Sequence, residues 1–255
     1  MILRRFIKHV RNQEWTAVFL DFIIVVMGIF VGLQVTNWSA SRADRALEHE
    51  YLERLLTDVQ LSIDRTSSTR GFMVDHRKKA KLILDSLLVC ELAPENRDDF
   101  ALGLSRLGRL VPSAYILGTL DEMQSSGKFT ILRNTELKDS LNALRASAQN
   151  EQSLILSIAA RVGPSMAHMD YWVVVTSDVE LRAVTKIGWD DIDLDFEALC
   201  ADTKFRGALT MTRSITQVYI DWNETALEKL TQTKALLQKE LGIEPEPIET
   251  MGGTP

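Results

Sequence analysis

The chain has 255 residues, of which 45% are hydrophobic and 25% are charged, and its formal net charge is −6. These proportions are typical of a chain that buries a core, and the length allows one folded domain of about 200 residues. The negative charge argues against nucleic acid as a partner, because phosphate binding requires a basic face.

The first segment, residues 1–15 (MILRRFIKHVRNQEW), places apolar residues at helical spacing among basic ones. This pattern predicts a short amphipathic helix that lies on anionic lipid headgroups. Four Lys or Arg residues precede the apolar stretch that follows, whereas only Arg42 and Arg45 come within 15 residues after Trp38. The positive-inside rule therefore predicts a cytoplasmic N-terminus and export of the chain from about residue 39.

The second segment, residues 16–38, is predicted to be a transmembrane helix. Its apolar core runs unbroken from Phe22 to Leu33. Trp15 and Trp38 flank it about 35 Å apart along a helix, which suits interfacial anchors on either side of a bilayer. A cleaved signal peptide, ending near Ser39-Ala40-Ser41, is the alternative; the length of the apolar stretch argues against it.

One face of the predicted span carries its only charge and two glycines. At 100° per residue, Asp21, Gly28 and Gly32 lie within about 40° of one another. The GxxxG spacing favours close approach of a second helix. For Asp21, contact with a partner helix and snorkelling to the cytoplasmic headgroups are both open, and a proton-relay role is a third hypothesis.

The remainder, residues 39–243, is predicted to be an exported all-α domain in which several long antiparallel helices stack on a stalk. The tail, residues 244–255, has too little apolar content to fold. The helical pattern and its breaks predict the following elements: a stalk helix ending near Thr66 at Thr-Ser-Ser-Thr, a helix over 72–90, a loop over 91–96, a helix over 98–111 closed by Pro112, and a short helix over 113–126 stopped by Gly127.

The later part of the chain is predicted to hold two long helices joined by an irregular region. The expected elements are an extended link over 128–132, a long helix capped by Asn134 that reaches Gly163-Pro164 and continues after a possible kink to Val175, an irregular segment over 176–192, a short helix over 196–201, and a final helix from an Asp202 cap to Gly242. The interior face of that last helix is expected to comprise Phe205, Leu209, Ile215, Val218, Trp222, Leu227, Leu230 and Leu237.

Cys90 and Cys200 are the only cysteines of the chain, and both fall in the predicted exported part. An even pair in an oxidising compartment predicts a disulfide, which would stabilise the fold by about 4–5 kcal/mol in the chain-entropy model. The alternative is two buried free thiols that act as small hydrophobic side chains.

Two groups of basic residues are considered as contact sites. Arg77, Lys78, Lys79 and Lys81 begin the predicted second helix, where a solvated face is expected and contact with anionic lipid or an acidic partner is the alternative. Lys128 and Arg133 flank the turn before Asn134 and are candidates for an anion site at the next helix N-terminus.

The sequence predicts no metal site, no cofactor and no catalytic centre. Asp191, Asp193 and Asp195 alternate like calcium ligands, but the glycine and glutamate that an EF-hand loop requires are missing. The four histidines do not follow zinc-binding spacing, and no nucleophile elbow, P-loop or dinucleotide fingerprint is present. An enzyme is therefore the third hypothesis for function.

Two patches resemble a known family. VVMGIFVGLQVTNW (Val25–Trp38), followed by a charged helix, resembles the start of a large bacterial family of single-pass membrane proteins of unknown function. Members of that family typically have an early acidic residue in the span, a Gly-rich middle and LQxxNW at its outer edge, which Asp21, Gly28, Leu33, Gln34, Asn37 and Trp38 match. A second patch over 118–141 resembles the family's exported-domain hallmark, in which a helix ends at Ser-Ser-Gly and the next begins after Arg-Asn. The family has no established activity to carry over.

These expectations combine into one hypothesis for location and role. The sequence predicts a bacterial inner-membrane protein whose periplasmic helical domain acts as an interaction or scaffold module. The expected partners are the lipid bilayer and either further copies of the chain or another membrane protein. A ligand-sensing or accessory domain that acts through a partner membrane protein is the alternative, and it rests on analogy with helical sensors.

Overall fold

The fold is all-α, as predicted. The computed structural model describes residues 15–172, 174–176 and 187–244. Over these residues the elements are α2 (Trp15–Val89), η1 (Pro94–Asn96), α3 (Arg97–Arg106), α4 (Gly118–Ser125), η2 (Lys128–Ile131), α5 (Thr135–Asp170), β1 (Val174–Val175), η4 (Trp189–Asp191), β2 (Ile192–Asp193), α6 (Phe196–Ala201) and α7 (Thr203–Leu241). By its internal contacts the chain divides into a first unit, Met1–Tyr51, and a second unit, Leu52–Pro255. The predicted amphipathic segment before residue 15 and the tail after residue 244 lie outside the described residues.

The first unit is described from Trp15 onward and consists of the N-terminal part of α2. α2 is the only helix in the described ranges that is long and apolar enough to cross a membrane. Its large apolar side chains between Phe19 and Trp38 are all 40–65% exposed. Leu, Ile, Val and Phe in a run this long form a helix that is apolar on every side, and such a helix requires lipid or other helices around it.

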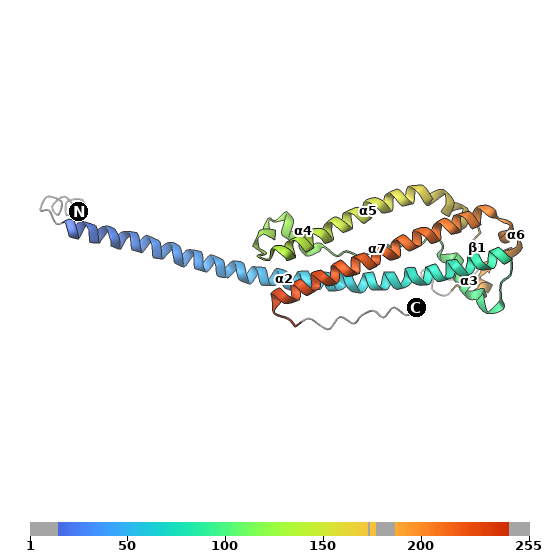
Figure 1. Ribbon diagram of the computed structural model, residues 1–255, viewed down its shortest axis with the longest axis horizontal. Helices are drawn as coiled ribbons and strands as arrows, with labels where there is room; N and C mark the ends of the chain where they lie inside the picture. The colour runs from blue at the N-terminus through green and yellow to red at the C-terminus, as the bar shows by residue number, and fades with distance from the viewer. Residues whose placement is uncertain (1–14, 173, 177–186, 245–255) are drawn as a thin grey trace. The chain divides into compact units, whose positions relative to one another are not determined.

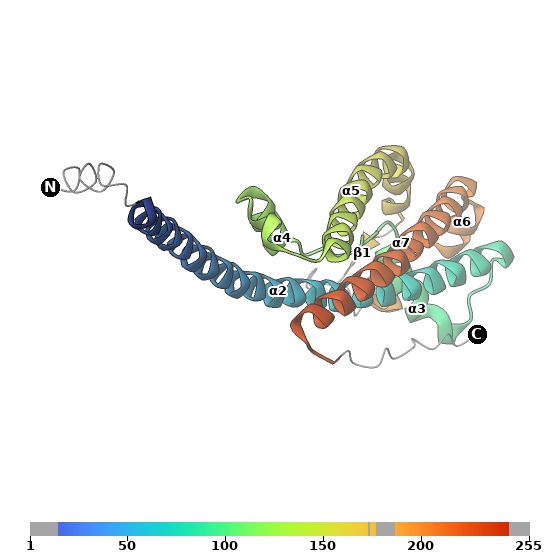
Figure 2. The ribbon, with the colours of Figure 1, turned by 60° about the vertical axis from the view of Figure 1, so that its left-hand side comes forward.

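The second unit is a helical bundle built on α7, which runs antiparallel to both α2 and α5. Against α2, the Arg70–Glu224 ion pair (2.6 Å) and the Arg77–Gln217 hydrogen bond fix the register. Against α5, Ser140 pairs with Thr233 (2.7 Å) and Lys229 donates to Ser147 (2.7 Å). In two views α7 runs beside α5 and crosses the second-unit part of α2 (Figures 1 and 2).

Two hydrophobic clusters fill the inside of the bundle. One gathers side chains of α2, α3, α6 and α7 around Phe100 and Phe205, which are both fully buried. The other packs Met73 of α2 against Tyr219 and Ile220 of α7. Burial of aliphatic and aromatic side chains on one stripe of each helix is the main stabilising term of such a bundle.

The expected break at residues 66–69 is wrong, because α2 continues unbroken to Val89. Hydroxyl side chains in helices compete with the backbone for hydrogen bonds, which is why Thr-Ser-Ser-Thr suggested a break. Here tertiary structure uses the first of these hydroxyls. Thr66 is fully buried, and its Oγ1 accepts from the Ala114 amide (3.0 Å) and donates to the Ala114 carbonyl (3.2 Å).

The expected helix over 98–111 is also wrong in extent. α3 ends at Arg106, Gly108 takes a left-handed φ of +84°, and α4 begins only at Gly118. The intervening residues, 107–117, form a non-helical segment that we call the strap. Its backbone is bound by side chains of neighbouring helices, so Pro112 lies within the strap instead of ending a helix.

Several helix ends agree with the predictions. Asn134 caps α5, Asp202 caps α7, and Gly127 and Gly242 take left-handed φ values of +72° and +68°. The short helix over 196–201 is confirmed as α6.

Three details of the later region differ from the predictions. The link at 128–131 is a 3-10 helix instead of an extended strand. α5 passes through Pro164 but ends at Asp170, and Val174–Val175 pairs with Ile192–Asp193 as a small antiparallel sheet. On α7, Val218 is exposed instead of interior, because the buried face there turns toward Tyr219 and Ile220.

Candidate functional site

The apolar part of α2 is the first candidate site. Asp21, Gly28 and Gly32 are exposed, and a Cβ at either glycine would meet no atom within 4 Å. No packing within the described chain therefore requires glycine at these two positions. Trp38 is exposed, with the Arg42 guanidinium 5.8 Å from its ring centroid; the side chain of Trp15 lies outside the described residues.

The two cysteines are joined in the structure. Cys90, which follows α2 with a left-handed φ of +54°, forms a disulfide with Cys200 of α6. Their Cα atoms are 5.6 Å apart, a distance that suits a disulfide. The bond ties the end of α2 to the segment that leads into α7, across 110 positions of sequence.

A buried carboxylate holds the strap against α5. Glu151 is only 7% exposed and accepts from the Ser113 hydroxyl (2.9 Å), the Ser113 amide (3.3 Å) and the Tyr115 hydroxyl (3.4 Å). Burial raises the pKa of Glu151 above its usual value, although these donors and Lys229 oppose the shift. Burial and the neighbouring Glu151 charge also raise the pKa of Tyr115.

The other side of the strap binds α2. Ser62 Oγ accepts from the Ile116 amide (2.9 Å), and Asp58 Oδ2 accepts from the Thr119 amide (2.9 Å) in the first turn of α4. Asp58 thus caps α4 from another helix, since no side chain at its own N-cap does so. These contacts explain how a non-helical segment is accommodated among helices with its backbone groups satisfied.

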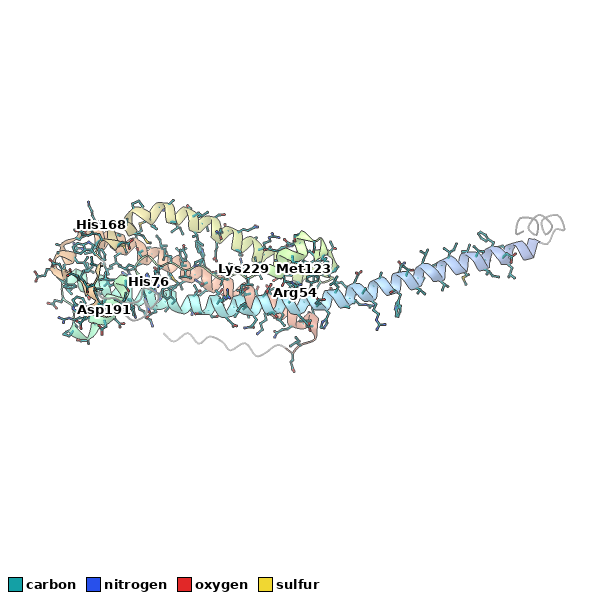
Figure 3. All side chains as sticks on the ribbon, turned by 180° about the vertical axis from the view of Figure 1, so that it is seen from behind. Arg54, His76, Met123, His168, Asp191 and Lys229 are labelled. Atoms are coloured by element: carbon teal, nitrogen blue, oxygen red, sulfur yellow. A yellow bond between two sulfur atoms is a disulfide. The ribbon has the colours of Figure 1, made fainter. Side chains whose placement is uncertain are left out.

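A second polar group lies between α2, α3 and α7. His76 is 2% exposed; its Nε2 is 3.0 Å from the Arg106 carbonyl, so Nε2 donates, and its Nδ1 is 3.4 Å from Thr216 Oγ1. Burial lowers the pKa of His76, and the nearby Arg106 charge adds to that shift. Figure 3 labels His76 together with Lys229, which lies nearer the end of the bundle that carries Arg54 and Met123.

A groove between α2 and α7 gathers basic side chains, and we call it the basic groove. It has a volume of about 560 Å³ and is lined by Arg77, Lys78, Lys81, Thr210, Arg213, Ser214 and Gln217. Sequence reasoning grouped Lys79 with the first three, but Lys79 turns away to Asp75 (3.0 Å) and Asp99 (3.2 Å). It missed Arg213, which lies 132 positions or more from the other basic lining residues and reaches them only through antiparallel packing.

The speculative anion site at Lys128 and Arg133 is not supported by a free helix end. Both residues are exposed, but the N-terminus of α5 is capped by Asn134, whose Oδ1 accepts from the Leu137 amide (3.0 Å). The Asn134 amide donates to Glu240 (2.7 Å), which adds negative charge beside that terminus. An anion at this terminus would meet this carboxylate, and the anion site stays a prediction.

The alternating aspartates have structural partners. Asp195 caps α6 by accepting from the Ala198 amide (3.0 Å), and Asp191 accepts from the Gly188 amide (2.8 Å). His168 binds Asp202 (2.8 Å), which also accepts from Trp172 Nε1 (2.9 Å). Over the ranges that the structure describes, no group of three or more His, Cys, Asp or Glu residues is arranged to hold a metal ion.

Asp202 combines these contacts with its capping role on α7. Burial alone would raise its pKa, but the Phe205 amide, Trp172 and His168 outweigh burial and lower the pKa to about 2. The carboxylate is therefore held ionised at the junction of α5, α6 and α7. Figure 3 places His168 and Asp191 at one end of the bundle, opposite Arg54 and Met123.

The fold and these sites define an all-α protein with one helix able to span a membrane and a disulfide-linked helical bundle. Comparison of the chain with family models, with curated proteins and with solved structures found no match. Its function is therefore inferred from its own residues.

Proposed function

We propose that this protein is a single-pass protein of the bacterial inner membrane that presents its helical domain to the periplasm as an interaction or scaffold module. The observation that carries the proposal is the apolar surface between Phe19 and Trp38, whose large apolar side chains are 40–65% exposed. Fully burying each such side chain in hydrocarbon contributes about 1.5–3 kcal/mol, so the segment favours a bilayer strongly.

Two observations support export of the bundle. The Cys90–Cys200 disulfide belongs to an oxidising compartment, and bacterial cytosol keeps thiols reduced. The basic residues before the span outnumber those just after it, which favours a cytoplasmic N-terminus. The resemblance of Val25–Trp38 to a bacterial family of single-pass proteins agrees with the same membrane.

The glycine face of the span supports association with a second helix. Because a Cβ at Gly28 or Gly32 would meet nothing within 4 Å, both positions leave room for a neighbouring helix. Asp21 lies on that face and either meets the partner or reaches the cytoplasmic headgroups. We favour self-association, with another membrane protein as the second partner.

Topology is tested by fusing alkaline phosphatase or green fluorescent protein after residue 243. Phosphatase folds only outside the cytoplasm, so the proposal expects an active phosphatase fusion and a non-fluorescent green fluorescent protein fusion. The reverse pattern would overturn both the periplasmic location and the compartment argument for the disulfide.

Self-association is tested by crosslinking the full chain in native membranes. Replacing Gly28 and Gly32 by Leu should abolish the crosslinked dimer, because the larger side chains keep the helices apart. Gly71→Leu is the matched control, since Gly71 is also a helical glycine of α2 with no atom within 4 Å of a built Cβ. Unchanged crosslinking in the double variant would rule out this face as the contact.

A periplasmic ligand-sensing or accessory domain is the second candidate function. The observation that favours it is the basic groove, because four cations meet there in a protein whose net charge is −6. A sensor of this kind would signal through the helix of a partner membrane protein.

A further inference from the structure

The basic groove is a meeting point of two helices that the sequence keeps far apart. Arg77, Lys78 and Lys81 lie at i, i+1 and i+4 on α2, and Arg213 lies on the facing turn of α7. The Arg77 guanidinium donates to Gln217 and so links the two walls. Both walls belong to the second unit, and the groove is therefore a feature of the bundle alone.

The four cations are not neutralised equally by the protein. Lys81 pairs with Asp85 (2.5 Å), and Arg77 is engaged by Gln217. Within the part of the chain that the structure describes, Lys78 and Arg213 form no hydrogen bond or ion pair. None of the described residues that line the groove is acidic, although the Gln217 amide donates to Asp221 (2.7 Å).

Arg213 brings an unpaired hydrogen-bond donor to the groove. Its Nε is buried and has no hydrogen-bond partner among the described residues. Leaving a buried donor unpaired costs about 1–3 kcal/mol, and more for a charged group, so an acceptor that reached this guanidinium would be stabilising. Thr210 and Ser214 use their hydroxyl protons on carbonyls of their own helix, so the groove's donors are guanidinium and ammonium groups.

We propose that the basic groove binds a compact anion that carries more than one phosphate group. Guanidinium forks and ammonium groups are the usual protein partners of phosphate oxygens. Because Lys78 and Arg213 lie on opposite walls, an anion with two charged groups could bind both at once. A volume of about 560 Å³ falls within the range of small-molecule sites. The inference deepens the sensing alternative and rests on the proposed function only for the compartment in which the ligand is met.

The test uses inorganic tripolyphosphate and the full chain in nanodiscs of zwitterionic lipid, titrated by calorimetry at low salt. The wild type should bind with a stoichiometry of one per chain. The Lys78→Gln/Arg213→Gln variant should bind about 30-fold more weakly, because each lost charge-assisted contact costs about five- to sixfold. Lys239→Gln removes an exposed cation of α7 outside the groove and should change the affinity less than twofold.

A single variant guards against loss of folding. Lys78 is exposed and has no hydrogen bond or ion pair with any residue that the structure describes, so Lys78→Gln should leave the melting temperature unchanged while weakening tripolyphosphate binding severalfold. Binding that is absent in the wild type, or that survives in the double variant, overturns the proposal. Tighter binding of hexaglutamate than of tripolyphosphate overturns it as well, since it assigns the groove to an acidic protein segment.

A second arm distinguishes a free phosphate compound from a lipid headgroup. The nanodiscs are sedimented with sucrose-loaded vesicles of phosphatidylcholine with or without one fifth phosphatidylglycerol. Retention on the anionic vesicles that is lost in the double variant assigns the phosphate to a lipid, whereas tripolyphosphate binding without retention assigns it to a soluble compound. Neither arm depends on topology, so failure of the fusion assay and failure of this proposal are separate results.

Discussion

Two stretches of α2 differ in what surrounds them. Between residues 19 and 38 the helix has apolar side chains on every side, all exposed, and glycines without neighbours. Between residues 52 and 89 it has one buried stripe, which includes Leu55, Val59, Met73 and Ile83, and mostly polar side chains elsewhere. The two stretches share one backbone hydrogen-bonding pattern but present different surfaces. The side chains, and not the helical backbone, decide whether lipid or protein can cover each surface.

The largest effect is expected from removing the Cys90–Cys200 disulfide, which joins α2 to the bundle only at the end of its bundle stretch. Cys90→Ala/Cys200→Ala should lower the free energy of unfolding of the bundle by about 4 kcal/mol, because the unfolded chain regains the entropy of a long loop. Chemical denaturation followed by tryptophan fluorescence measures the loss. The apolar stretch makes no use of the bond, so the variant should stay in the membrane fraction; its release would contradict the division between the two stretches.

The next largest effect is expected from placing a charge in the apolar stretch and comparing it with the same change in the bundle stretch. Met27→Arg places a charge in the middle of the apolar stretch and should cost about 3 kcal/mol of membrane insertion. Extraction of membranes with alkaline carbonate should release part of this variant. Leu88→Arg, at a position that is 63% exposed on the bundle stretch, is the control and should remain fully in the pellet. Equal release of both variants would show that residue 27 does not lie in hydrocarbon.

A smaller effect tests the polar interior of the bundle. Glu151→Ala should destabilise the domain by about 2 kcal/mol, because the Ser113 amide and hydroxyl lose their acceptor. The folded-state pKa of Glu151 is raised by burial, so its contribution is fully present at low pH and decreases as pH rises through that pKa. The loss caused by the substitution should therefore be larger at pH 4.5 than at pH 8. Glu228→Ala, at an exposed position of α7, should show no such difference.

The smallest effect has the opposite pH dependence. Asp202→Ala should cost about 1 kcal/mol through loss of the α7 cap. The folded-state pKa of Asp202 is lowered to about 2, so its contribution is present above the ordinary aspartate pKa and is lost as pH falls toward 2. Urea midpoints at pH 6 and pH 2.5 should differ for the wild type more than for this variant. A constant difference between the two proteins would refute the role of the ionised carboxylate.

Local signals in the sequence predicted much of the fold because they act within a few residues. Asn134 and Asp202 cap helices through amides two or three positions ahead, and Gly127 and Gly242 end helices through their own φ angles. The apolar stretch of α2 needs only its length and composition to be recognised. Each of these features depends on neighbours in sequence.

The features that were predicted wrongly or missed depend on distant parts of the chain. The helix runs through Thr66 because Ala114 binds its hydroxyl, and the strap is non-helical because Thr66, Ser62 and Glu151 bind its backbone. For the buried polar group around His76 one sequence signal was available. Thr212 and Thr216 are spaced i and i+4 on the apolar stripe of α7, and this spacing indicates a buried polar layer.

The sequence by itself determined the helical class, the apolar segment long enough to cross a membrane and most helix ends, since propensity, hydropathy and capping are local properties. Only the tertiary structure decided the course of the strap, the burial of Glu151 and His76, and the meeting of Arg213 with Arg77, Lys78 and Lys81. The physical reason is that these side chains lie from 30 to 140 positions apart in the sequence and come together only when the helices pack against one another, and no local pattern encodes that register.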